Sequence, residues 1–81
     1  MILRTTPSYI RLAVDGKNVT IQGEAAGIGT PKGPYFVAYS NSIVHWDAPN
    51  DWESIDSSEK NRILQVLQED CKVRNFPLEI E

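Results

Sequence analysis

The chain of 81 residues is 41% hydrophobic and 23% charged, which is the composition of one small folded domain and not of a disordered or collagen-like chain. Its single cysteine, Cys71, excludes an internal disulfide, and no stretch approaches the roughly 20 apolar residues of a membrane-spanning helix. The first residues contain no basic segment followed by an apolar run, so we expect no signal peptide and a cytoplasmic protein.

The net charge of −3 is unevenly distributed along the chain. Residues 1–46 carry four basic and two acidic residues, a balance of +2, whereas residues 47–81 carry four basic and nine acidic residues, a balance of −5. Phosphate binding needs a clustered basic surface, so nucleic acid is not the expected direct partner. The acidic second part suits a basic protein partner, but a net charge of this size is equally what keeps a small domain soluble.

The first part of the chain predicts a short strand followed by a hairpin. Residues 2–4 are a candidate edge strand that ends at Pro7. Residues 9–14 and 19–24 each alternate apolar and polar side chains, which is typical of strands with one buried face. Between them, Gly16 can adopt the positive φ of a tight turn. A hairpin with one solvated face indicates an antiparallel sheet that carries helix on one side only.

Residues 25–34 form a predicted loop with three glycines and two prolines. Its glycines suggest a phosphate cradle, but such a cradle needs a helix immediately after the loop, and here Pro34 and a strand follow. The spacing of a dinucleotide-binding motif is also missed by one residue. We therefore interpret this stretch as a plain glycine loop and predict no cofactor.

Residues 35–46 are the most strand-like part of the sequence, because aromatic and β-branched side chains dominate them. Ser40-Asn41-Ser42 interrupts the apolar pattern. The interruption is either a bulge in one long strand or a tight turn that makes residues 36–39 and 43–46 a second hairpin. We favour the hairpin.

The last part of the chain predicts one helix and a final strand. Asp56-Ser57-Ser58-Glu59 has the pattern of a capping box, and the helix continues to about Val73. Asn75 can supply the left-handed residue that ends it. Residues 76–80 then alternate as a short strand, and Pro77 implies either an edge strand or the first residue of a strand.

These elements predict an α+β fold, with an antiparallel sheet of four to six strands packed on one amphipathic helix in a single domain of residues 1–81. Cys71 lies on the apolar stripe of the helix, so we expect a buried thiol. The predicted core consists of Ile10, Leu12, Val14, Val19, Ile21, Phe36, Ala38, Ile63, Leu64, Leu67 and Leu78.

His45 is the only histidine. A catalytic base needs a nucleophile or an orienting carboxylate beside it, and no neighbouring residue has the spacing of a known triad. We interpret His45 as a surface or interface residue, and a pH-sensitive contact stays open. With no nucleophile–base pair, metal-ligand cluster or cofactor loop in the sequence, we predict that the protein is not an enzyme.

An acidic tract with two tryptophans follows the central stretch. The tract lacks the pattern of a calcium loop, so we predict no metal there and interpret it as a solvated loop or a protein-binding patch. Its acidic residues are Asp47, Asp51, Glu53 and Asp56. Trp46 lies at a strand end, where a tryptophan usually covers a small core. Trp52 lies in a polar segment, where the core and a protein interface are equally plausible.

Four features in this order resemble one of the immunity-protein families of bacterial polymorphic toxin systems. The first is Gly23-Glu24, and the second is Phe36-Val37-Ala38-Tyr39-Ser40-Asn41-Ser42-Ile43. The third is Trp46-Asp47-Ala48-Pro49. The fourth is the capped helix from Asp56 followed by the final strand. The resemblance covers nearly the whole chain.

The resemblance implies a small α+β protein that binds and neutralises a cognate toxin without catalysing a reaction. The acidic second part of the chain suits a basic toxin such as a nuclease. The contact residues expected on this basis are Trp46, Asp47, Asp51, Trp52 and Glu53. The alternative function is a small adaptor or homo-oligomerisation domain that acts through an exposed strand edge.

Overall fold

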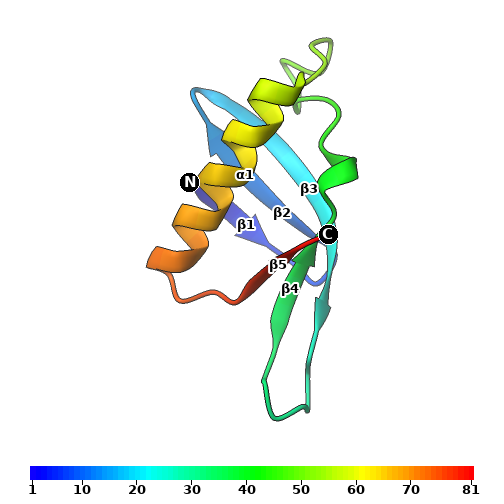
Figure 1. Cartoon of the computed structure of the whole chain (residues 1–81). Coiled ribbons are helices and arrows are strands. Elements are labelled where there is room, and N and C mark those ends of the chain that lie inside the picture. The colour runs from blue at the N-terminus through cyan, green and yellow to red at the C-terminus, as the bar shows by residue number, and fades with distance from the viewer.

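Five strands form one sheet, and a single α-helix lies across one of its faces (Figure 1). The computed structural model describes every residue from Met1 to Glu81. The strands lie in chain order as β1 (Ile2–Thr5), β2 (Tyr9–Val14), β3 (Lys17–Ala26), β4 (Tyr35–Ala38) and β5 (Leu78–Ile80). A 3₁₀ turn, η1 (Ser40–Ser42), and the helix α1 (Ser57–Val73) lie between β4 and β5. The predicted α+β class is confirmed.

The sheet is mixed, although an antiparallel sheet is predicted from the sequence. Strands β1 to β4 pair antiparallel, and β5 pairs parallel to β4. A parallel connection needs a crossover of a dozen or more residues. The segment from η1 to the end of α1 supplies it, so the chain returns to the sheet beside β4 and runs in the same direction. Of the two alternatives for Pro77, the structure shows an edge strand, because β5 is the last strand of the sheet and begins at the next residue.

The turn between β2 and β3 and the ends of α1 agree with the predictions. Asp15 and Gly16 have φ of 51° and 84°, which makes a two-residue hairpin turn. At the start of α1, the Glu59 amide donates to the Asp56 carboxylate over 2.7 Å, and the Glu59 side chain accepts from the Asp56 amide over 3.2 Å. At the other end, Asn75 adopts a φ of 54°.

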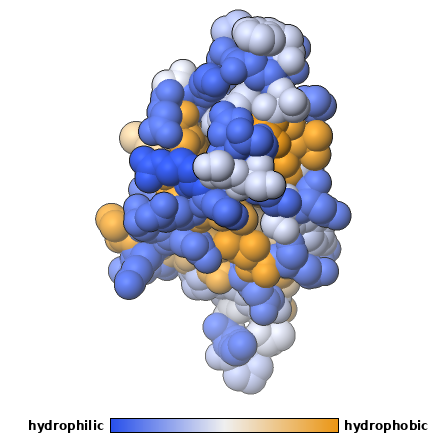
Figure 2. All heavy atoms as spheres, turned by 45° about the horizontal axis from the view of Figure 1, so that its top comes forward, coloured by the Kyte–Doolittle hydropathy of each residue, from blue (hydrophilic) through white to orange (hydrophobic).

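The core lies between α1 and the face of the sheet toward it. Nine of the predicted core residues are buried, whereas Leu64 and Leu78 are half-buried at its margin. Ile2, Val37 and Ile43 are buried without having been predicted. On the surface, large hydrophobic side chains are scattered over different elements, and Figure 2 shows hydrophobic patches separated by hydrophilic residues. None of the helices has the length and apolarity that crossing a membrane requires.

The predicted hairpin of residues 36–39 and 43–46 is wrong. After η1 the chain does not return along β4 but continues beside the first half of β3. The Tyr39 amide donates to the Gln22 carbonyl over 2.8 Å, and the Asp47 amide donates to the Asn18 carbonyl over 2.8 Å. Within β3, only Gly23–Ala26 pair with β4, so the preceding part of β3 has backbone groups without a strand partner on that side. The irregular segment satisfies some of them, which favours this path.

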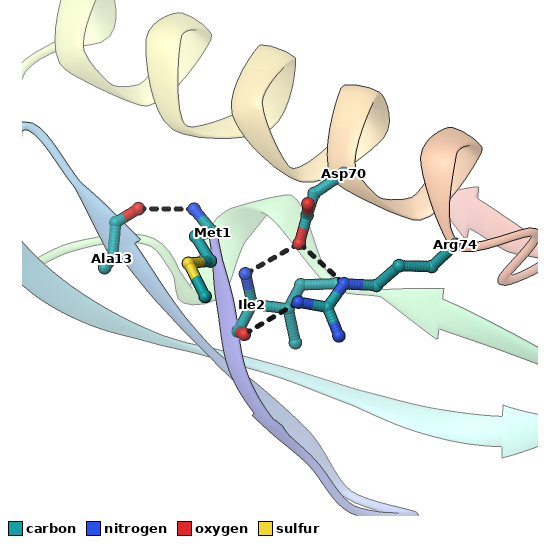
Figure 3. A network of polar contacts seen from close by, with 5 residues as sticks. All are labelled: Met1, Ile2, Ala13, Asp70 and Arg74. Carbon is teal, nitrogen blue, oxygen red and sulfur yellow. Dashed lines mark hydrogen bonds and ion pairs between the residues drawn. The ribbon is translucent and has the colours of Figure 1, made fainter.

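The outer edge of β1 is closed by side chains of the last turn of α1 and of the residue that follows it (Figure 3). The Met1 ammonium donates to the Ala13 carbonyl over 2.7 Å, which directs the backbone groups of the next residue away from β2. The Ile2 amide donates to Asp70 over 2.7 Å, and the Ile2 carbonyl accepts from Arg74 over 3.3 Å. Arg74 and Asp70 are themselves paired over 3.0 Å. At Ile2, therefore, the edge is not free to pair with another strand.

Replacing Asp70 with asparagine is expected to lower the free energy of unfolding by about 1 kcal/mol at neutral pH. The Ile2 amide, and to a lesser extent Arg74, hold the pKa of Asp70 below its ordinary value. A carboxylate whose pKa is lower in the folded state stabilises the protein above its unfolded pKa, about 3.9, and loses this effect as the pH falls through the folded value.

The difference between wild type and Asp70→Asn should therefore be constant from pH 7 to about pH 5 and shrink below about pH 4. Urea unfolding at several pH values measures it. Glu69→Gln is the control, because Glu69 is exposed and hydrogen-bonds to Gln65 of the same helix. A difference that persists undiminished at pH 3 would show that the Asp70 carboxylate does not stabilise the β1 edge.

Candidate protein-binding site

The five expected contact residues lie in the segment that leads from the sheet to α1, near the top of Figure 1. The structure divides them into two groups. Three of them are held in the fold by packing, hydrogen bonds or ion pairs, and two point to solvent.

Trp46 belongs to the core, with 5% of its surface exposed. Its ring forms part of the wall of a hollow of about 410 Å³ beside the start of α1. The Lys17 ammonium lies 5.2 Å from the centre of the ring, a distance at which a cation is attracted to an aromatic face. The indole Nε1–H is buried and has no hydrogen-bond partner within the chain. Trp46 therefore lies in the core, as is usual for a tryptophan at a strand end.

Asp47 fastens the irregular segment to the sheet. Its carboxylate accepts a hydrogen bond of 2.8 Å from the Thr20 hydroxyl and lies 3.5 Å from Arg11 Nε. Its amide donates to the Asn18 carbonyl of β3. With 23% of its side chain exposed, Asp47 is largely occupied by these partners.

Glu53 joins the acidic loop to the start of β3. Lys17 Nζ donates to its carboxylate over 2.9 Å, and Asn50 Nδ2 donates to the other oxygen over 3.1 Å. The hydrogen bond from Lys17 lowers the pKa of Glu53, and the same hydrogen bond raises the pKa of Lys17. This pair fixes the position of the loop and also holds Lys17 near the Trp46 ring.

Asp51 and Trp52 are the two expected contact residues that face solvent. Trp52 has 79% of its surface exposed, and Asp51 is exposed as well. They are the two central residues of a turn in which the Glu53 amide donates to the Asn50 carbonyl over 3.0 Å. This turn directly follows another, in which the Asn50 amide donates to the Asp47 carbonyl over 2.9 Å. The Ala48–Pro49 peptide bond before them is cis. The exposed indole and carboxylate are thus neighbours on a loop whose two ends are both bonded to the sheet.

The remaining motif residues explain why the sequence pattern is long and ordered. A side chain at position 23 would collide with the Val37 carbonyl and the Phe36 ring, so Gly23 is needed for the close approach of β3 and β4. The Ser42 hydroxyl accepts from the Gln22 amide over 2.9 Å and donates to the Tyr39 carbonyl over 2.7 Å. Gly23 therefore lets β4 lie close to β3, and Ser42 holds the segment after β4 against β3. The sequence pattern alone did not reveal these roles.

His45 and Cys71 are accounted for by the fold. His45 is exposed, as expected, and its backbone forms a single bridge to Ser54. Cys71 is 2% exposed, and burial raises the pKa of its thiol. The thiol is therefore protonated and packed in the core, as a small apolar side chain would be.

The structure is that of a small α+β domain in which, of the five expected contact residues, a tryptophan and a carboxylate are left exposed on a fixed loop. The family comparison gives the class of protein. The model of the family Immunity protein 74 matches residues 2–81, and the chain belongs to that family. No curated protein and no solved structure matches the chain.

Proposed function

We propose that this protein binds a cognate bacterial toxin and blocks it by occupying its surface, without catalysing a reaction. The observation that carries the proposal is the match of the Immunity protein 74 family over residues 2–81. The exposure of Trp52 beside Asp51 supports a contact site at the loop of residues 48–55, because tryptophan is among the residues that contribute most to protein interfaces. The protein acts in the cytoplasm of the cell that the toxin would otherwise damage.

The toxin is a basic protein such as a nuclease. The balance of −5 in residues 47–81 motivates this part of the proposal. An acidic protein approaches a basic partner faster and can cover the cleft that would bind phosphate. The affinity is expected to fall steeply as salt rises, because salt screens exposed charges that are separated by more than the Debye length, about 10 Å at 0.1 M. An affinity that does not change over a tenfold range of salt would argue against a charge-driven partner.

The double variant Asp51→Ala/Trp52→Ala is expected to bind the toxin at least about thirtyfold more weakly, the effect of losing one interface hot spot worth about 2 kcal/mol. Both side chains are exposed, so its unfolding free energy should stay within about 0.5 kcal/mol of wild type. Calorimetric titration with the toxin encoded beside the gene measures the affinity.

The matched control is Glu69→Ala/Val73→Ala, which also removes one exposed carboxylate and one exposed apolar side chain, but from α1. It should bind like wild type. Equal affinities for all three proteins would move the interface away from residues 48–55 while leaving the function intact. A wild-type chain that neither binds the toxin nor protects cells from it would contradict the function itself.

The alternative of an adaptor that pairs through a strand edge gains no support at β1. The outward backbone groups of Ile2 are already bonded to Asp70 and Arg74. Pairing a second strand there would first break these bonds, which costs free energy before any new hydrogen bond forms.

A further inference from the structure

The face of the sheet opposite α1 has no helix over it (Figure 1). We name this surface the open face. The strand registers and the alternation of side chains decide which residues lie on it. They are Tyr9 and Arg11 of β2, Thr20, Gln22 and Glu24 of β3, Val37 of β4, Tyr39 directly after β4, and Glu79 of β5. Residues on such a surface usually face solvent, but in one part of the open face a residue is buried.

That part is centred on Val37. Glu24 is the register partner of Val37 on one side, and Glu79 is its partner on the other. Val37 is only 6% exposed although no helix covers it, because side chains of neighbouring strands close over it. Tyr39, two residues further along the chain, lies on the same side and is half-buried. The centre of this region is therefore packed, while its carboxylates remain at the surface.

The carboxylates of this region have no cationic partner within the chain. The four ion pairs join Arg11 to Asp47, Lys17 to Glu53, Arg62 to Asp15 and Arg74 to Asp70. None of these pairs includes Glu24, Glu79 or Glu81, which are all exposed. Lys32 lines the same hollow as Glu79 but forms no ion pair with it.

Tyr39 lies between two of these carboxylates. Burial first, and then the neighbouring Glu24 and Glu81, raise the pKa of its hydroxyl. A hollow of about 410 Å³ adjoins it, lined by Tyr39, Ser40, Asn41 and Glu81. An aromatic ring and a carboxylate at one hollow are the groups that bind the end of a lysine or arginine side chain.

From this arrangement we infer that the open face around Tyr39 is a second contact surface for the toxin, which receives a basic patch and takes one lysine or arginine side chain into the hollow beside Glu81. The inference rests on the proposed function for the identity of the partner. The charge of this surface decides the chemistry of the partner. The carboxylates would repel nucleic acid, and a second copy of the chain packed face to face would bring like carboxylates together.

The test is the variant Glu24→Gln/Glu81→Gln, which removes the two charges beside Tyr39 and keeps the size of both side chains. The control is Asp15→Asn/Glu69→Gln, which changes the net charge by the same amount on other surfaces, and asparagine is tolerated at the left-handed position of Asp15. The toxin encoded beside the gene is titrated with wild type and with both variants at two salt concentrations.

The open-face variant is expected to bind the toxin at least tenfold more weakly, with a shallower dependence on salt, while the control stays within about threefold of wild type. An affinity of the open-face variant within twofold of wild type would overturn the inference, and so would an equal loss in both variants, since only net charge would then matter. A dimer of the free chain that the open-face variant strengthens would also overturn it, in favour of a second copy as occupant. If wild type itself binds no toxin, the proposed function fails, which is distinct from these outcomes.

Discussion

Replacing Trp46 with alanine is expected to lower the free energy of unfolding by about 3–5 kcal/mol, the usual loss when a buried tryptophan or phenylalanine is truncated. Trp46 is 5% exposed and packs in the core cluster, so truncation leaves a cavity where the irregular segment meets α1. A domain of this length has a total stability of about 4–12 kcal/mol. The variant should therefore lose at least about a quarter of the domain's stability and unfold at a lower urea concentration than wild type.

Trp52→Ala is the matched comparison, since it removes the same side chain from an exposed position. Its unfolding free energy should change by no more than about 0.5 kcal/mol. Urea unfolding followed by circular dichroism measures both variants, because far-ultraviolet signals do not depend on the tryptophan that has been removed. Equal losses for Trp46→Ala and Trp52→Ala would contradict the assignment of one tryptophan to the core and the other to the surface.

Trp46→Phe separates the packing of the ring from its polar group. The indole Nε1–H is buried without a partner in the chain, and an unpaired buried donor destabilises the folded state. Phenylalanine removes that donor and keeps most of the apolar volume, so it should lose less than half as much stability as alanine. A loss as large as that of Trp46→Ala would mean that the Nε1–H makes a stabilising hydrogen bond.

Replacing Gly23 with alanine is expected to lower the free energy of unfolding by about 3 kcal/mol, the upper part of the range for overpacked sites. An added Cβ would lie 2.5 Å from Phe36 Cε1 and would also collide with the Val37 carbonyl. The carbonyl belongs to the backbone of β4 and cannot rotate away, so the pairing of β3 with β4 must open. Gly23 is therefore required for the space it leaves and not for an unusual φ.

The control for Gly23 is Gly29→Ala in the loop between β3 and β4. Gly29 has a φ of 81° and nothing within 4 Å of an added Cβ, so alanine there meets only backbone strain, about 1 kcal/mol. Thermal unfolding and urea unfolding should rank the proteins as wild type, Gly29→Ala and then Gly23→Ala. The reverse order of the two variants would show that β3 and β4 do not approach as closely as the structure describes.

The expected losses of stability indicate that the motif residues act mainly in the fold. Gly23 allows β4 to approach β3 closely, and Ser42, Trp46 and Asp47 hold the segment after β4 in place through hydrogen bonds or packing. The motif therefore identifies the fold of the family, whereas the candidate contacts lie beside it, at Asp51 and Trp52 and on the open face. Substitutions in the motif are expected to reduce toxin binding through loss of folded protein, so binding experiments on them need a measurement of stability.

The sequence by itself determined the local elements of this protein. The alternation of residues 9–14 and 19–24 predicted β2 and most of β3, and the capping box at Asp56 predicted the start of α1. These predictions depend on side-chain period, capping and turn geometry, which neighbouring residues decide among themselves. The resemblance of the ordered motifs likewise indicated the immunity-protein family that the match over residues 2–81 shows.

Only the tertiary structure decided how the distant segments meet. The path of residues 43–47 beside β3, the parallel pairing of β5 and the closing of β1 by Asp70 depend on contacts between residues far apart in the chain. No local pattern marks such contacts, because they form where backbone groups of one element are left without partners by another. For the same reason the sequence left Trp52 open between core and interface, and only the fold shows that it is exposed while Trp46, six residues earlier, is buried.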